Sequence, residues 1–196
     1  MSLVELETSP SLWEQFFSIF PLVIVGSREP DGSYDLAPKH LAMPMSWENH
    51  YGFVCAPHHR TYQNILTNKQ FTVSFPRPDQ ILAIGLTADP RAADHTKPAL
   101  RAVPTFPAQQ VDSVFVSGAY LFLECKLEKI VDDLGVNSLI IGEIVAAQAD
   151  EVFLRAHETD DQELIYNNPL LAYLYPSRFA TISQTLSFPF PKDFKR

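Results

Sequence analysis

The sequence predicts a mainly β fold with peripheral helices, in which one antiparallel sheet closes into a barrel. Three observations support this prediction. Strand-like apolar runs follow one another closely along the chain, the turns between them are short, and few helical segments intervene. A doubly wound parallel sheet is disfavoured, because it needs crossover helices between its strands.

The first predicted element is a short amphipathic helix near the amino terminus. Ser9 and Pro10 supply an N-cap and a first-turn proline, and apolar side chains follow at spacings of three and four up to Phe20. The β-branched run Leu22–Val25 is then predicted to be a strand. The dipeptide Asp31-Gly32 is predicted to form the hairpin turn after it.

The middle of the chain predicts further strands around one helix. The expected strands are 41–47, 51–56, 71–75, 119–131 and 138–148, and the expected helix is 61–68. Tyr62, Ile65 and Leu66 would form one face of that helix. Short helices and loops are expected over 87–107. Past residue 150 the pattern weakens, and no element is assigned apart from an extended tail at 188–191.

Length and composition predict one domain. The 196 residues suffice for one sizeable core, and no linker, repeat or low-complexity tract divides them. We expect a single domain over 1–196, with a barrel core at about 20–150 and a carboxy-terminal extension at 151–196. No apolar run approaches the ~20 residues of a membrane crossing. The first residues lack a secretory pattern, so no membrane partner and a cytoplasmic location are expected.

Charge and cysteine content exclude several function classes. The formal net charge of -8 would repel a nucleic-acid backbone, so no nucleic-acid partner is expected. Cys55 and Cys125 stand in apolar runs, which indicates two unpaired buried thiols in a reducing compartment. The seven glycines match neither a dinucleotide fingerprint nor a P-loop, so any phosphate must be held in another way.

Other site chemistries are also disfavoured. The sequence has no nucleophile elbow of a hydrolase, and the acidic pairs 132–133 and 160–161 fall in predicted turns, where solvated carboxylates are expected. His58 and His59 suggest a metal site, with His40 or His50 as further ligands. Adjacent residues in an extended chain point to opposite sides, however, so no metal site is expected.

The stretch from Pro57 to Ile65, which leaves a strand and enters a helix, carries the most chemical information. Arg60 offers a guanidinium that matches phosphate oxygens, Thr61 offers a hydroxyl, and the helix start offers unpaired backbone N–H groups. This pattern predicts a phosphate cradle built without glycine. The alternative is that Thr61 only caps the helix and Arg60 is a solvated surface charge.

The order of the motifs resembles the flavin-reductase-like family of FMN-binding split barrels. The matching segments are Asp35–Trp47, Tyr51–Ala56, Arg60-Thr61-x-x-Asn64-Ile65, Phe71–Ser74, Asp94–Lys97, Leu123–Lys126 and Leu139–Val145. The likeness covers roughly residues 22–148, with a looser echo in the tail. It rests on the shared order and spacing of these segments.

The resemblance implies a homodimeric, Greek-key-like split barrel that holds FMN. It places the phosphate near the helix start and the isoalloxazine ring against the strand 37–41. The implied cofactor-binding residues are Ala37, Pro38, Lys39, His40, Leu41, His59, Arg60, Thr61, Asn64, Ser74 and Lys97. Of these, Asn64 and Ser74 are expected on the phosphate side, and Lys97 by the flavin. No side chain is required as a covalent or proton-transfer catalyst.

Four positions depart from the family pattern. Members usually carry asparagine at Asp35, and serine followed by an aromatic residue at His40-Leu41. A carboxylate near a flavin is unfavourable unless it is paired, so Asp35 is expected to point away or to bond Lys39 or a backbone amide. Many members carry, at Asn137, a histidine associated with the nicotinamide or substrate side, so the reductase step needs a direct test here.

The implied function is that of an FMN-dependent oxidoreductase. NADH or NADPH would be the transient reductant, and a flavin or another small molecule would be the electron acceptor. A non-catalytic FMN-binding electron carrier is one alternative. A barrel that binds a small apolar ligand without flavin is another, favoured by the 12% aromatic content. Bleaching of the flavin by NADH or NADPH separates the first two, and the colour of the purified protein tests the third.

Overall fold

The two edge strands of the central sheet are consecutive in the sequence, which requires the sheet to curl. The structure is a computed structural model, and it describes residues 1–9, 11–155 and 160–191. The seven strands, in order across the sheet, are β3 (Tyr34–Lys39), β2 (Val23–Arg28), β6 (Gln70–Phe75), β9 (Leu121–Leu134), β10 (Asn137–Ala149), β5 (His50–Cys55) and β4 (Ala42–Pro44). Only His40 and Leu41 separate β3 from β4, so the opposite edges lie close together.

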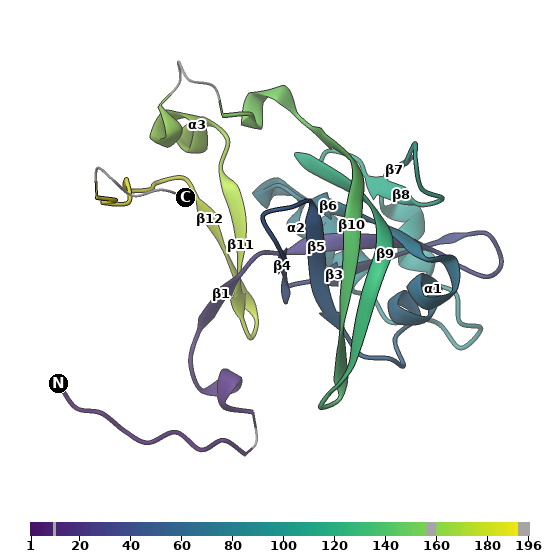
Figure 1. Ribbon diagram of the computed structural model, residues 1–196, viewed down its shortest axis with the longest axis horizontal. Coiled ribbons are helices and arrows are strands. Elements are labelled where there is room, and N and C mark those ends of the chain that lie inside the picture. The colour runs from purple at the N-terminus through teal and green to yellow at the C-terminus, as the bar shows by residue number, and fades with distance from the viewer. Residues whose placement is uncertain (10, 156–159, 192–196) are drawn as a thin grey trace.

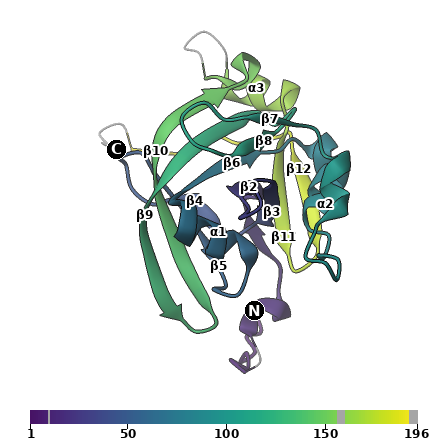
Figure 2. The same cartoon turned by 90° about the vertical axis from the view of Figure 1, so that its right-hand side faces the viewer.

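The predicted mainly β fold with an antiparallel, barrel-like sheet is confirmed. Every pairing in the central sheet is antiparallel, and Figures 1 and 2 show its strong curl, with the long β9–β10 hairpin along one side. The strands expected at 51–56, 71–75, 119–131 and 138–148 correspond to β5, β6, β9 and β10. The strand expected at 41–47 is reduced to β4.

Strand β2 illustrates how the two faces of the sheet are filled. Val23 and Val25 pack with Phe71 in the core inside the barrel, whereas Ile24 between them packs with Ile84 in a second core outside it. This alternation follows from the two-residue period of a strand. The outer core is covered by α2 (Ile81–Thr87), which was not predicted, together with η3 (Pro98–Ala102) and β8 (Val114–Val116). η2 (Pro78–Gln80) directly precedes α2, and β7 (Thr105–Pro107) pairs with β8.

The helix expected at 61–68 is confirmed as α1 (Arg60–Asn68). It packs against β2 and β3. Tyr62 and Ile65 are buried on its inner face, whereas Leu66 is exposed. The helix ends at Lys69, whose left-handed backbone lets its N–H donate to the carbonyl of Ile65.

The prediction of an amphipathic helix before Phe20 is wrong, except for a single helical turn. Leu12–Gln15 form a 3-10 turn, η1, and Ser18–Phe20 form a strand, β1. β1 pairs with β11 (Leu170–Tyr175), so its backbone hydrogen bonds come from a segment about 150 residues away, which local spacing does not reveal. Pro10 lies outside the described residues.

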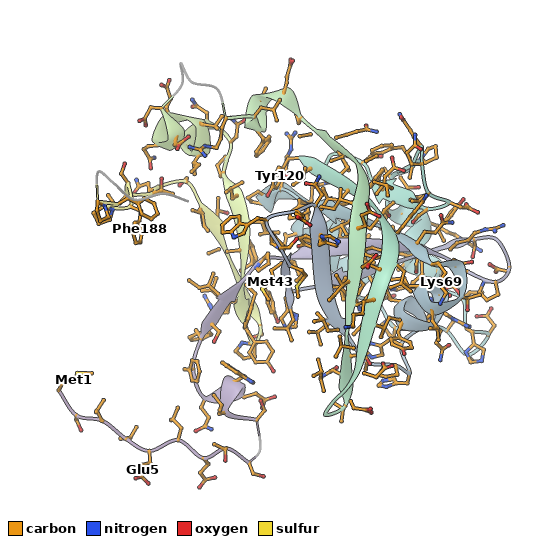
Figure 3. All side chains as sticks on the ribbon, in the orientation of Figure 1. Met1, Glu5, Met43, Lys69, Tyr120 and Phe188 are labelled. Atoms are coloured by element: carbon orange, nitrogen blue, oxygen red, sulfur yellow. The ribbon has the colours of Figure 1, made fainter. Side chains whose placement is uncertain are left out.

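The carboxy-terminal extension builds a second sheet with the amino-terminal segment. Its strand order is β1-β11-β12, with β12 at Arg178–Ile182, and η4 (Glu151–Phe153) and α3 (Asp161–Asn167) precede it. Figure 1 shows this sheet beside the barrel, and Figure 3 shows Met1 and Glu5 standing clear of the body.

Two of the acidic residues expected in solvated turns have defined structural roles. Asp160 caps α3, and its carboxylate accepts the N–H groups of Gln162 and Glu163. Asp132 lies in β9 and accepts hydrogen bonds from the Tyr62 and Ser138 hydroxyls. In the described part of the chain, no helix is both long and apolar enough to span a membrane.

Candidate functional site

An apolar cavity of about 560 Å³ opens at the seam between β3 and β4. It is lined by Trp13, Phe20, Pro38, Lys39, His40, Leu41, Val54, Cys55, Ala56, His59, Asn137 and Tyr175. None of these lining residues is a carboxylate. Most of them are apolar or aromatic, so the cavity suits a planar, largely uncharged group.

His40 belongs to an aromatic cluster on the wall of the apolar cavity. Its ring stacks on Tyr175 at 5.6 Å and 27°, and it contacts Tyr173 at 5.0 Å and Phe20 at 5.6 Å. Burial, followed by the charge of Lys39, lowers the pKa of His40, so the imidazole is neutral near pH 7. The cluster therefore packs the seam against strands β1 and β11. It presents an uncharged surface to the apolar cavity.

A cationic cavity of about 670 Å³ adjoins the apolar one and shares Pro38, Lys39 and His59 with it. Its charged side chains are the cations Lys39, Arg60, Arg91 and Lys97 and the carboxylates Asp35 and Asp89. Four cations against two carboxylates give this cavity a positive charge in a chain of net charge -8. The cationic cavity therefore attracts anions.

The start of α1 lies in the wall of the cationic cavity, to which Arg60 and Thr61 both contribute. His59 is the N-cap residue, and no side chain makes a capping hydrogen bond there. Thr61 is thus not the cap, contrary to the alternative considered from the sequence. The positive end of the helix dipole and the N–H groups of the first turn favour an anion at this point.

Glu29 connects the helix start to a distant loop. Its carboxylate, only 8% exposed, lies 3.2 Å from Nε of Arg60 and 2.5 Å from a terminal nitrogen of Arg91. Arg60 is therefore an ion-paired side chain and not a free surface charge. The same nitrogen of Arg91 lies 2.9 Å from Oδ1 of Asp35, which links the two carboxylates through one guanidinium.

Asp35 is paired as its burial requires, but with other partners than expected. Only 4% of its side chain is exposed, and its Oδ1 contacts Arg91 and, at 3.5 Å, the ammonium of Lys97. The expected bond to Lys39 or to a backbone amide is not what holds it. Glu29, Asp35, Arg60, Arg91 and Lys97 together form what we call the ion network.

The ammonium of Lys97 is directed at protein groups. It donates to the carbonyls of Leu36 at 2.8 Å and Thr87 at 2.6 Å, in addition to its ion pair with Asp35. Burial lowers the pKa of Lys97, and the carboxylate of Asp35 opposes that shift. With three protein partners for three N–H groups, Lys97 lines the cationic cavity while tying β3 to α2.

The structure brings together most of the residues predicted for the site, but not Asn64 and Ser74. Ala37 lines the cationic cavity, Pro38 and Lys39 line both cavities, and His40 and Leu41 line the apolar one. Asn64 is buried and donates to the Ser27 hydroxyl at 3.1 Å. Ser74 is buried and accepts the Val116 N–H at 3.1 Å. Neither lines the two cavities.

Sequence reasoning missed Glu29 and Arg91, whose ion pairs join Arg60 and Asp35 at the cationic end of the site. His58 and His59 lie with their rings edge to face at 4.4 Å, but the described residues contain no group of three side chains placed to hold a metal ion. The joined cavities fit a molecule that carries a planar apolar ring at one end and an anion at the other.

A family model described as "Flavin reductase like domain" matches residues 18–174 of the chain. No curated protein matches the sequence at a significant level.

Solved structures share the fold at low sequence identity. Nitrilotriacetate monooxygenase component B from Bacillus cereus is 16% identical, with a TM-score of 0.82 over 96% of this chain and 100% of that one. Flavoredoxin from Methanosarcina acetivorans is 15% identical, with a TM-score of 0.77 over 98% of this chain and 97% of that one. The NADH:FAD oxidoreductase of Streptomyces globisporus is 12% identical, with a TM-score of 0.73 over 92% of this chain and 98% of that one.

Proposed function

This chain belongs to the flavin-reductase-like family, and on that basis we propose that it binds FMN and passes electrons from NADH or NADPH to a flavin or another small-molecule acceptor. The observation that carries the proposal is the junction of the two cavities at Pro38, Lys39 and His59. It places an apolar, aromatic space beside a cationic one, as the two ends of FMN require.

The isoalloxazine ring is assigned to the apolar cavity and the phosphate to the cationic one. The seam residues 38–41 and Val54 offer apolar and backbone contacts to the ring. Arg60 and the uncapped start of α1 face the anion end, where charge-assisted hydrogen bonds are strongest. Asn64 and Ser74, buried in other hydrogen bonds, support the surrounding elements.

Bound FMN supplies the two-electron chemistry, and the protein binds, orients and shields it. Asn137, at the position where many family members carry histidine, lines the apolar cavity. Its amide can donate and accept hydrogen bonds but does not titrate. It can therefore orient an amide or carbonyl of the electron donor or acceptor without adding a pH dependence of its own.

The test is an absorbance spectrum of the purified protein, with the chromophore extracted and identified, followed by rapid mixing with NADH and with NADPH. The proposal expects FMN, bleached by at least one of the two reductants. Bound FMN that neither reductant bleaches would favour the electron carrier. A protein that binds no flavin would overturn the proposal.

We also propose that the protein is a cytoplasmic homodimer. Trp13 and Leu41 line the mouth of the apolar cavity yet are 54% and 41% exposed, and Trp47 is fully exposed. A second copy over this mouth would bury these side chains and shield the flavin from water. The two unpaired, buried thiols of Cys55 and Cys125 are compatible with a reducing compartment.

A further inference from the structure

A third cavity, of about 570 Å³, adjoins the cationic cavity, and we call it the outer cavity. Asp35, Arg60, Arg91 and Lys97 line both cavities, and the remaining member of the ion network, Glu29, lines the outer one. The ion network is therefore a partition between the cationic cavity and the outer one. A ligand that extends from the cationic cavity into the outer cavity must pass the network.

The two sides of this partition differ in charge. The outer cavity is lined by the cations Arg60, Arg91, Lys97 and Arg101 and by the carboxylates Glu29, Asp31, Asp35 and Asp94. Four cations face four carboxylates, so the outer cavity has no net charge, whereas the cationic cavity is positive. A single phosphate on the cationic side of the partition is stabilised by electrostatic attraction. A second phosphate in the outer cavity would receive no comparable stabilisation.

The partition is held in place from several directions. A guanidinium nitrogen of Arg91 donates to the carbonyl of His95 at 2.7 Å, which fixes the loop that carries both residues. Lys97 is bonded to β3 and to α2. To move Arg91 aside, a ligand would have to remove a partner from Glu29 and from Asp35, and buried carboxylates that lose partners are costly.

We propose that the ion network makes the site select a terminal phosphate monoester and reject a pyrophosphate that continues into a second group, so that it holds FMN and discriminates against FAD. The inference rests on the proposed function. A terminal monoester needs anion contacts only on the cationic side. In FAD the phosphate continues into a second phosphate and an adenosine, and where these extend into the outer cavity they meet the carboxylate of Glu29. Glu29 is thus a positioning residue: it holds Arg60 and Arg91 together and repels the extension.

The experiment measures the dissociation constants of FMN, FAD and riboflavin by flavin fluorescence titration of the full chain after removal of any bound flavin. Two variants break the network differently. Glu29→Gln removes the charge at nearly constant shape. Arg91→Ala opens the partition while leaving Glu29 paired with Arg60 and Asp35 with Lys97. The control is Arg101→Ala, which removes a cation of the outer cavity outside the network. Circular dichroism confirms that each variant folds, and either network variant alone carries the test.

The parent protein should prefer FMN over FAD by roughly tenfold or more, and this preference should fall by about threefold or more in the network variants, while Arg101→Ala stays within that limit. Riboflavin, which has no phosphate, should respond little. A parent that binds FMN and FAD alike, or network variants that keep the parent's preference, would overturn the inference and leave the proposed function standing. The inference would also be overturned if Arg101→Ala lost as much of the preference for FMN as the network variants do. If the parent binds no flavin at all, the proposed function itself fails, and the inference falls with it.

Discussion

Nε of Arg60 lies 3.2 Å from Oε2 of Glu29, so the guanidinium at the start of α1 is held by a buried carboxylate while it faces the cationic cavity. The ion pair restricts the side chain to one orientation and offsets part of its charge. The remaining N–H groups of the guanidinium stay free to meet an anion, because a guanidinium has five donors. The ion pair with Glu29 therefore orients Arg60 in advance but also offsets part of the charge that Arg60 can offer to a ligand.

We predict that Arg60→Ala weakens FMN binding by about 1–2 kcal/mol, or roughly 5- to 30-fold. An unshared guanidinium in contact with a phosphate dianion would be expected to contribute about 2–3 kcal/mol. The smaller value follows because Glu29 already neutralises part of the charge of Arg60. Fluorescence titration measures the change, and riboflavin binding should stay within about twofold.

The matched control for Arg60→Ala is Arg28→Ala. Arg28 also makes an ion pair, with Asp112 at 3.1 Å, but both partners are more than 40% exposed and neither lines the cationic cavity. FMN binding should be unchanged in this variant. Equal losses in the two variants, or a riboflavin loss as large as the FMN loss in Arg60→Ala, would remove Arg60 from the phosphate site.

Lys97→Met is predicted to lower the free energy of unfolding by about 2–4 kcal/mol. The substitution leaves two buried carbonyls, of Leu36 and Thr87, without their donor, and Asp35 with one cation fewer. Urea unfolding followed by circular dichroism measures the loss. Lys129→Met, on the exposed face of β9, should change stability by less than about 0.5 kcal/mol. A Lys97 variant as stable as this control would show that the three contacts contribute little.

Only half of the residues at the cationic end of the site could be predicted from the sequence. Arg60 and Thr61 stand out because a strand-to-helix transition is a local pattern with a known chemical consequence. Glu29 and Arg91 carry no such signal, because they lie 62 positions apart in a hairpin and a loop where charged residues are ordinary. Only the fold brings them together.

The barrel could be predicted because its strands have a local sequence signal. The terminal sheet could not, because it depends on pairing between distant segments. Strands such as β2 alternate between two buried faces, and a hairpin turn follows them, so local sequence contains the signal. β1 contains three residues and depends on pairing with β11, which is mostly half-buried. The apolar spacing before Phe20 therefore fits a helix, and the distant strand decides the outcome.

A homodimer is predicted at micromolar concentration, with a mass by light scattering of twice the 22.1 kDa of one chain. Met43 lies in β4 and Trp47 follows this strand, which comes directly after the seam in the sequence, and both side chains are exposed. Replacing both with serine should therefore weaken association, because less apolar area would be buried. Leu82→Ser, at a leucine of α2 that is also largely exposed, is the control. A parent protein that scatters as a monomer would contradict the prediction.

The last prediction concerns acid stability and His40. Burial and the charge of Lys39 lower the pKa of this imidazole below its ordinary value of 6.5. Between the lowered folded value and 6.5, the unfolded chain binds more protons than the folded one, so stability falls as the pH falls through this window. The contribution is complete above about pH 6.5 and is lost below the folded pKa.

We therefore expect the urea midpoint of the parent protein to fall between about pH 7 and pH 5, and to fall less in His40→Phe. Phenylalanine keeps a ring against Tyr175 but takes up no proton. The dependence of the urea midpoint on pH should be weaker in His40→Phe but should not disappear, because burial also lowers the pKa of His59. Tyr175→Phe, which leaves the imidazole stacked and buried, should retain the parent's slope. If His40→Phe lost stability with acid as steeply as the parent, protonation of His40 would not be what weakens the aromatic cluster.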